Sequence, residues 1–161
     1  MGTGYTYRCK TCGHSFSAYL GVGFLYPRLY QDVMTSARKG NLGKQAKRFL
    51  EENPYGAIDP KTVIAQCEDC GNYDAVMDLS MYVPKEGQPP RIHKGNWTIS
   101  DFDPEAEYVF EFDEYDLKEL YEHRCTLCKG RLHILKEQEP ELLKCPKCGD
   151  DMIIEDVVMW D

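Results

Sequence analysis

Between residues 24 and 53, apolar residues recur at the spacing of one helix face. Pro27 suits the first turn of a helix, Gly40 ends the first apolar stretch, and Pro54 follows the second. The pattern predicts a helical hairpin over about 24–53. Its apolar stripes consist of Leu25, Leu29, Tyr30, Val33, Met34 and Ala37 in the first helix, and Leu42, Ala46, Phe49 and Leu50 in the second.

The rest of the chain favours strands. Residues 75–83 alternate between apolar and polar positions, which predicts one half-buried strand. Residues 84–104 contain four prolines and no periodic pattern, so we expect a linker or long loop there. Residues 113–124 fit either a short helix or a strand. Further strands are predicted at 5–8, 14–20, 61–66, 107–112, 131–135 and 152–160.

The strongest chemical signal is the arrangement of the eight cysteines, all of which fall in Cys-x-x-Cys pairs. Two such pairs supply four thiolates, the number that a structural tetrahedral zinc requires. Four pairs therefore predict two sites and two Zn²⁺ ions. Iron remains a minor alternative, because four sulfurs also suit a rubredoxin-like centre. The predicted metal ligands are Cys9, Cys12, Cys67, Cys70, Cys125, Cys128, Cys145 and Cys148.

The spacing of the pairs bears on which pairs share an ion. Sixteen residues separate Cys128 from Cys145, a normal ribbon spacing, whereas 54 separate Cys12 from Cys67. We therefore expect sequential pairing, first with second and third with fourth. A nested scheme, first with last and second with third, stays open because loop-closure entropy grows slowly with length.

This pairing predicts an α+β protein with two four-cysteine, zinc-ribbon-like β modules, the first carrying the helical hairpin as an insertion. The corresponding domains are residues 1–83, with the insertion at about 24–53, a linker at 84–104, and residues 105–161.

Charge is divided unevenly along the 161 residues, whose formal net charge is −8. Residues 1–66 hold nine basic and four acidic side chains, and the remainder is strongly acidic. An overall negative charge opposes generic nucleic-acid binding. We therefore expect at most weak binding of nucleic acid, and we expect a protein partner instead. The basic side chains of the predicted hairpin are Arg38, Lys39, Lys44, Lys47 and Arg48.

No pattern in the sequence indicates catalysis. A His-Glu-x-x-His helix, a nucleophile elbow and a phosphate-binding loop are all absent, and four-cysteine zinc sites have no open coordination position. No run of about 18 apolar residues predicts a membrane span, and no signal segment predicts export. We expect a cytoplasmic protein, and the sequence leaves open whether it is an enzyme while favouring a non-catalytic role.

Residues 7–16, Tyr-Arg-Cys-Lys-Thr-Cys-Gly-His-Ser-Phe, resemble the opening knuckle of small bacterial FmdB-type zinc-ribbon proteins. Taken whole, the chain is similar to uncharacterised bacterial proteins with two zinc ribbons. The resemblance implies zinc binding in a bacterial cytosol and no particular activity.

The sequence thus favours a zinc-binding adaptor or regulatory protein that acts through protein–protein contacts. One alternative is a nucleic-acid-binding zinc ribbon that uses the basic hairpin and the aromatic residues Tyr5, Tyr7, Phe16 and Tyr19. A second alternative is a rubredoxin-like iron protein for electron transfer.

Overall fold

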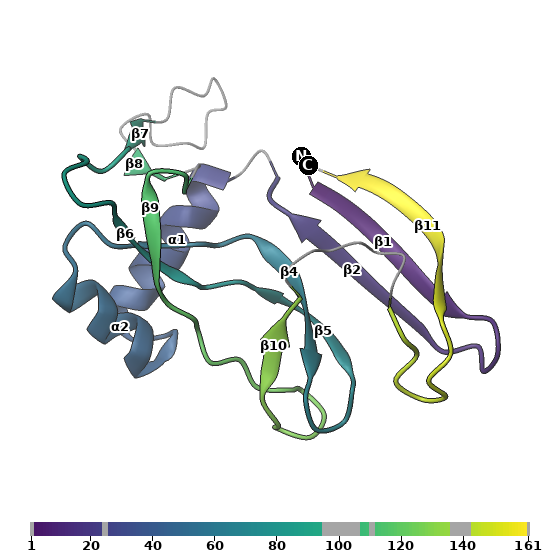
Figure 1. The fold of residues 1–161 in the computed structure, drawn as a ribbon. Helices are drawn as coiled ribbons and strands as arrows, with labels where there is room; N and C mark the ends of the chain where they lie inside the picture. Colours follow the sequence, from purple (N-terminus) through teal and green to yellow (C-terminus); the bar gives the residue numbers. More distant parts are fainter. Residues whose placement is uncertain (1, 24–25, 95–106, 110–111, 136–142, 161) are drawn as a thin grey trace. The chain divides into compact units, whose positions relative to one another are not determined.

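A computed structural model of the chain describes residues 2–23, 26–94, 107–109, 112–135 and 143–160 (Figure 1). The chain forms two compact units. We call residues 1–23, 61–78 and 122–161 the cysteine unit, and residues 24–60 and 79–121 the helical unit. Both units differ from the consecutive domains expected from the sequence, because the chain leaves the cysteine unit and returns to it twice.

A six-stranded antiparallel sheet runs through the cysteine unit, in the order β10-β4-β2-β1-β11 with β5 paired to β4. Its strands are β1 (Gly2–Cys9), β2 (Ser15–Gly21), β4 (Thr62–Cys67), β5 (Tyr73–Met77), β10 (Leu132–Ile134) and β11 (Met152–Trp160). Strands β2 and β4 pair only at Gly21 and Thr62, so the sheet divides into two three-stranded halves.

The two halves repeat one topology. We call β1, β2 and β11 the outer module, and β4, β5 and β10 the inner module. In each, a hairpin (β1-β2 or β4-β5) is completed by a third strand from late in the chain, which pairs with the first strand of the hairpin. The inner module therefore lies, in sequence, entirely between the two parts of the outer module.

Buried side chains hold the two modules against each other. Tyr7, Leu20 and Met152 of the outer module lie in one apolar cluster with Ile64 and Tyr73 of the inner module. Burying side chains of this size contributes roughly 1.5–3 kcal/mol each, so the modules share much of their core energy. A smaller cluster lies within the inner module and contains Ala65, Cys67, Cys125 and Leu132.

The helical unit contains the two helices near the positions that periodicity predicts. They are α1 (Tyr26–Lys39) and α2 (Gly43–Glu52), and they contact each other. Neither has the length and apolar character that a membrane crossing requires. Whether they act as an insertion into a ribbon stays a prediction. Leu25 lies outside the described residues.

Short strands complete the helical unit. The strands β3 (Ala57–Ile58), β6 (Met81–Pro84) and β9 (Tyr115–Glu119) form a sheet in the order β3-β6-β9. A separate pair is formed by β7 (His93–Lys94) and β8 (Glu107–Tyr108). Residues 113–124 therefore contain a strand and no helix, while residues 95–104 of the predicted linker lie outside the described residues.

The predicted single strand at 75–83 is wrong, because two strands occupy it. Strand β5 ends at Met77 in the cysteine unit, and β6 begins at Met81 in the helical unit. Between them Leu79 adopts a left-handed conformation, with φ of 55°. Such a residue breaks a strand without disturbing the alternation of apolar side chains, so the sequence pattern does not reveal the break.

Candidate metal centres

The eight cysteines gather into two groups of four, and in each group the sulfur atoms lie within 4.8 Å of one another. The outer group belongs to the outer module and consists of Cys9, Cys12, Cys145 and Cys148. The inner group belongs to the inner module and consists of Cys67, Cys70, Cys125 and Cys128. Every cysteine named from the sequence thus lies in a four-sulfur cluster that can hold a metal ion.

The pairing of the Cys-x-x-Cys motifs is nested, so the expectation of sequential pairing is wrong. Strand pairing explains the result. Cys9 lies opposite Met152 in the β1-β11 ladder, and Cys67 lies opposite Leu132 in the β4-β10 ladder. In each module, the Cys-x-x-Cys motif of the hairpin therefore shares a sulfur group with the Cys-x-x-Cys motif that directly precedes the third strand of that module. The short spacing between the last two motifs favoured a local ribbon, but it carries no information on which strand each one pairs with.

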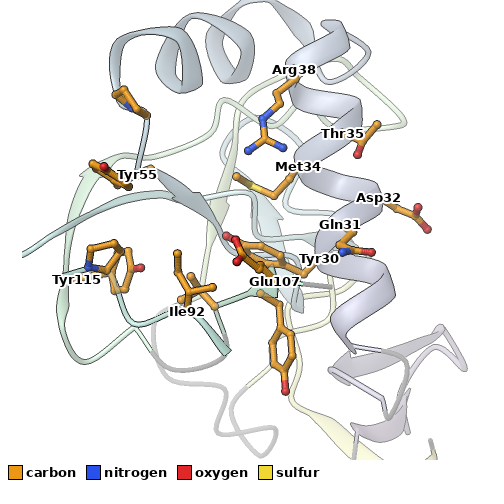
Figure 2. Close-up of a pocket in the computed structure, with 15 residues that line it drawn as sticks. Tyr30, Gln31, Asp32, Met34, Thr35, Arg38, Tyr55, Ile92, Glu107 and Tyr115 are labelled. Carbon is orange, nitrogen blue, oxygen red and sulfur yellow. The ribbon is translucent and has the colours of Figure 1, made fainter. Parts of the chain in front are cut away.

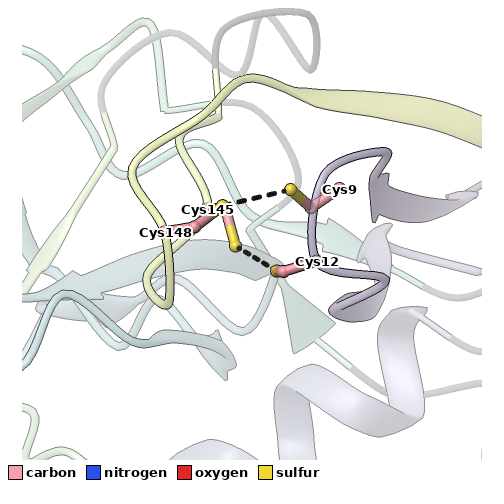
Figure 3. A group of neighbouring side chains, drawn as sticks. All are labelled: Cys9, Cys12, Cys145 and Cys148. Carbon is pink, nitrogen blue, oxygen red and sulfur yellow. Dashed lines mark hydrogen bonds between the residues drawn. The ribbon is translucent and has the colours of Figure 1, made fainter.

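Four sulfur atoms face one another in the outer group, as Figure 3 shows. The Sγ atoms of Cys9 and Cys148 are 3.4 Å apart, and those of Cys12 and Cys145 are 3.5 Å apart. In the inner group, the corresponding distances are 3.4 Å for Cys67 and Cys128, and 3.7 Å for Cys70 and Cys125.

These distances fit a metal better than a disulfide. Four sulfurs placed about 2.3 Å from a tetrahedral ion are about 3.8 Å apart, close to the spacing in both groups. A disulfide bond needs about 2.05 Å, and all eight cysteines are free. Zinc and iron form bonds of similar length to sulfur, so this geometry alone does not distinguish them.

Each Cys-x-x-Cys turn is closed by the same backbone hydrogen bond, in which the residue after the second cysteine donates to the carbonyl of the first. The bond runs from Gly13 to Cys9, and from Gly71 to Cys67, at 2.9 and 3.0 Å. These glycines have φ near +70°, which glycine adopts without steric cost. In the third turn Lys129 takes this place, with φ of 65°. That turn therefore carries backbone strain that the other three avoid.

The first cysteine of each hairpin is buried, yet its thiol has a lowered pKa. The backbone amide of Cys12 is the main cause that lowers the pKa of Cys9, to about 7. The amide of Cys70 does the same for Cys67, also to about 7. For Cys148 the amide of Asp150 works to lower the pKa, but hydrogen bonds with neighbouring cysteines raise it to about 12. A divalent cation removes this conflict, since it stabilises all four thiolates together.

The two groups differ in how their second turn is held. In the inner group the carboxylate of Asp74 accepts hydrogen bonds from the backbone and hydroxyl of Thr126, both at 3.0 Å. Proline has no amide proton to donate, and Pro146 is the equivalent residue of the outer group. The sequence analysis did not identify Asp74. The feature that could have pointed to it is an acidic residue four positions after Cys70, the second cysteine of its motif.

Tyr73 connects the inner module to the outer group. Its hydroxyl accepts a hydrogen bond of 3.2 Å from the backbone amide of Lys144, the residue before Cys145. Its ring lies 5.9 Å from that of Phe16 on β2. Tyr73 of the inner module thus packs beside the outer group. His123 is buried and its Nε2 lies 2.9 Å from the Asp78 carbonyl oxygen, so it joins neither group.

A cavity of about 710 Å³ lies in the helical unit, along α1 (Figure 2). Its lining includes the buried side chains of Tyr30, Met34 and Tyr115. Asp32 and Arg38 bring both signs of charge to the lining. Cavities of this volume hold small molecules, but a lining of mixed charge selects no particular class of ligand.

The aromatic residues considered for nucleic-acid binding are mostly used in packing. Tyr7 is fully buried, and Tyr5 and Phe16 pack against the same core, which leaves Tyr19 as the exposed one at 58%. Among the basic residues of the helices, Arg48 forms an ion pair of 2.7 Å with Glu119.

Comparison of the chain with protein families, with curated proteins and with solved structures gives no match. The similarity of the first knuckle to FmdB-type proteins therefore stays a prediction.

Proposed function

We propose that this protein binds two zinc ions as permanent structural elements and acts as a non-enzymatic adaptor or regulator through contacts with other proteins. The observation that carries the metal-binding part of the proposal is that all eight cysteines lie in two four-sulfur groups. An ion held by four cysteines has no position left for water or substrate, which favours a structural over a catalytic role.

In nested zinc ribbons, each ion would have a specific structural role. Each ion would join a hairpin to a strand that enters the fold more than 50 residues later in the chain. A module of three short strands buries little apolar surface, so it depends on its ion for much of its stability. The FmdB resemblance adds the expectation of a bacterial, cytoplasmic protein, in which a reducing environment keeps the thiols available for zinc.

The charge of the chain disfavours nucleic acid as its partner. Arg48 of the helical unit already pairs with an acidic residue of the same unit, and the net charge of −8 repels phosphates. A nucleic-acid-binding role is therefore left to the test described next.

Elemental analysis of the purified full-length chain tests the metal assignment, and electrophoretic mobility shift at about 150 mM salt tests the partner class. We expect two zinc ions per chain, a colourless protein, and no submicromolar binding of DNA or RNA. A red protein that contains chiefly iron would replace the proposal with electron transfer. Submicromolar nucleic-acid binding that Lys44→Glu abolishes would replace the adaptor role.

A further inference from the structure

The cavity of the helical unit is lined on one side by a row of α1 side chains (Figure 2). Tyr30, Met34 and Arg38 are spaced four residues apart, so they follow one face of the helix over about 12 Å. Tyr30 and Met34 are buried, whereas Arg38 is exposed. The row therefore runs from an apolar and aromatic end to a positively charged end.

Tyr115 lines the same cavity from β9 and brings a hydroxyl whose hydrogen is unused. Its side chain is 5% exposed, and its hydroxyl has no partner in hydrogen-bond geometry among the described residues. Burial raises the pKa of Tyr115 and the backbone amide of Arg91 opposes this rise, but an amide N–H can only donate to the phenol oxygen. The phenol hydrogen still lacks an acceptor, which is a costly state for a buried donor.

Arg38 brings a charge to the cavity that the fold does not neutralise. No ion pair joins it to a carboxylate in the described part of the chain. Burial raises the pKa of Tyr30, Tyr115 adds to this rise, and Arg38 opposes it, so both residues act on the Tyr30 hydroxyl. Tyr30, Tyr115 and Arg38 therefore belong to one polar site rather than to separate parts of the lining.

The two acidic residues of the lining do not cancel Arg38. Asp32 is two residues from Tyr30, which turns it about 200° around the helix, and Figure 2 shows its carboxylate on the side of α1 away from the cavity. Glu107 already takes part in an interaction of the fold. The lining thus carries charges of both signs, but the groups left to bind a ligand are hydrogen-bond donors.

We propose that this cavity binds a small aromatic carboxylate that carries a hydrogen-bond acceptor at the opposite end of its rings. The carboxylate pairs with Arg38, because a planar guanidinium donates two parallel hydrogen bonds to such a group. The acceptor takes the hydrogen of the Tyr115 hydroxyl. The rings lie against Met34 and Tyr30, which form an apolar and aromatic wall. The volume of about 710 Å³ is within the range of small-molecule sites.

The same groups disfavour ligands of other charge. A phosphate carries close to two negative charges, and one guanidinium compensates them poorly in a chain of net charge −8. A cationic ligand is repelled by Arg38 and leaves the phenol hydrogen of Tyr115 without an acceptor. No cysteine lines the cavity, so this site does not depend on which metal the sulfur groups hold.

Calorimetric titration of the full-length, metal-loaded protein tests the proposal. The probe is a naphthoate with an acetyl group at the opposite end of its rings. Three analogues change one feature each, with ethyl in place of acetyl, or with carboxamide or aminomethyl in place of the carboxylate. We expect the acetyl naphthoate to bind, the ethyl analogue to bind about fivefold more weakly, and the carboxamide and aminomethyl analogues at least about tenfold more weakly.

Two variants assign the contacts. Arg38→Gln should weaken binding of the acetyl naphthoate at least about tenfold. Lys39→Gln is the matched control, since Lys39 is the next residue of α1 and does not line the cavity, and it should leave the affinity unchanged. Tyr115→Phe should abolish the difference between the acetyl and ethyl analogues and leave the affinity for the ethyl analogue as it is. Circular dichroism establishes that each variant folds.

Absence of binding of the acetyl naphthoate, or equal or tighter binding of the aminomethyl analogue, would overturn the proposal. An affinity that Arg38→Gln leaves unchanged, or that Lys39→Gln lowers equally, would also overturn it. So would a difference between the acetyl and ethyl analogues that persists in Tyr115→Phe, because the acceptor would then bind elsewhere.

Discussion

Replacing a single cysteine should remove the ion of its group and unfold the module that contains this group. Cys148→Ser takes a sulfur from the outer group, and Cys128→Ser takes one from the inner group; both cysteines are exposed, so neither change disturbs packing directly. Binding of a structural zinc contributes about 10–16 kcal/mol, while a whole domain is stable by about 5–15 kcal/mol. A module that loses its ion therefore has too little energy left to stay folded.

The nested pairing determines where the loss appears. In Cys148→Ser, β1, β2 and β11 should lose protection from amide exchange, while β4, β5 and β10 keep theirs and one ion remains. The inner module should still be weakened by roughly 1–3 kcal/mol, because Ile64 and Tyr73 lose apolar neighbours from the outer module. Metal analysis and amide exchange measured by mass spectrometry follow both effects.

Cys128→Ser serves as the reciprocal control and should expose β4, β5 and β10 first. The reasoning would be refuted if Cys148→Ser released β10 and the turn at Cys125 while β1 and β2 stayed protected. That result is what sequential pairing requires.

Three further perturbations address individual contacts. Asp74→Ala removes the hydrogen bonds to Thr126 and should lower the stability of the inner module by about 1 kcal/mol, with no change in the outer module; equal loss in both, measured by amide exchange, would contradict it. Lys129→Gly relieves the left-handed conformation and should stabilise the inner module by about 1 kcal/mol against chelator-induced unfolding, and unchanged or lower resistance would contradict the strain. Tyr7→Phe removes a buried hydroxyl that has no hydrogen-bond partner among the described residues, and thermal melting should show a gain of about 1 kcal/mol. Burial raises the pKa of Tyr7 from 10 to about 12, because the ionised phenolate is poorly solvated in the core. This group therefore leaves the free energy of unfolding unchanged below pH 10 and lowers it as pH rises from 10 to 12. The unchanged chain should therefore lose up to about 3 kcal/mol more than Tyr7→Phe over that interval, and parallel pH profiles would refute the assignment.

Local features of this protein follow well from its sequence. Strand β11 occupies residues 152–160 as predicted, and α1 and α2 lie within the predicted span of 24–53. These elements are set by spacing and by turn residues such as Gly40 and Pro54, which act over a few positions. The eight cysteines that gather into the two four-sulfur groups are also evident from the sequence, because Cys-x-x-Cys spacing is itself a local property.

The pairing of Cys-x-x-Cys motifs that lie far apart in the chain could not be predicted from local sequence patterns. Each first hairpin can accept either later motif as far as spacing is concerned, and loop entropy favours the sequential scheme by about 1–2 kcal/mol. Side-chain packing decides, because Tyr7 and Met152 share a core that sequential pairing would separate. Leu79 shows the same limit on a smaller scale, since a left-handed residue leaves no trace in the hydrophobic pattern.

Replacing the bound metal with ¹¹³Cd and correlating its signals with cysteine protons would test the nested arrangement most directly. The account predicts two cadmium signals. One should couple to the β-protons of Cys9, Cys12, Cys145 and Cys148, and the other to those of Cys67, Cys70, Cys125 and Cys128. A signal that couples to Cys9 and Cys67 together, or a single bound cadmium per chain, would contradict it.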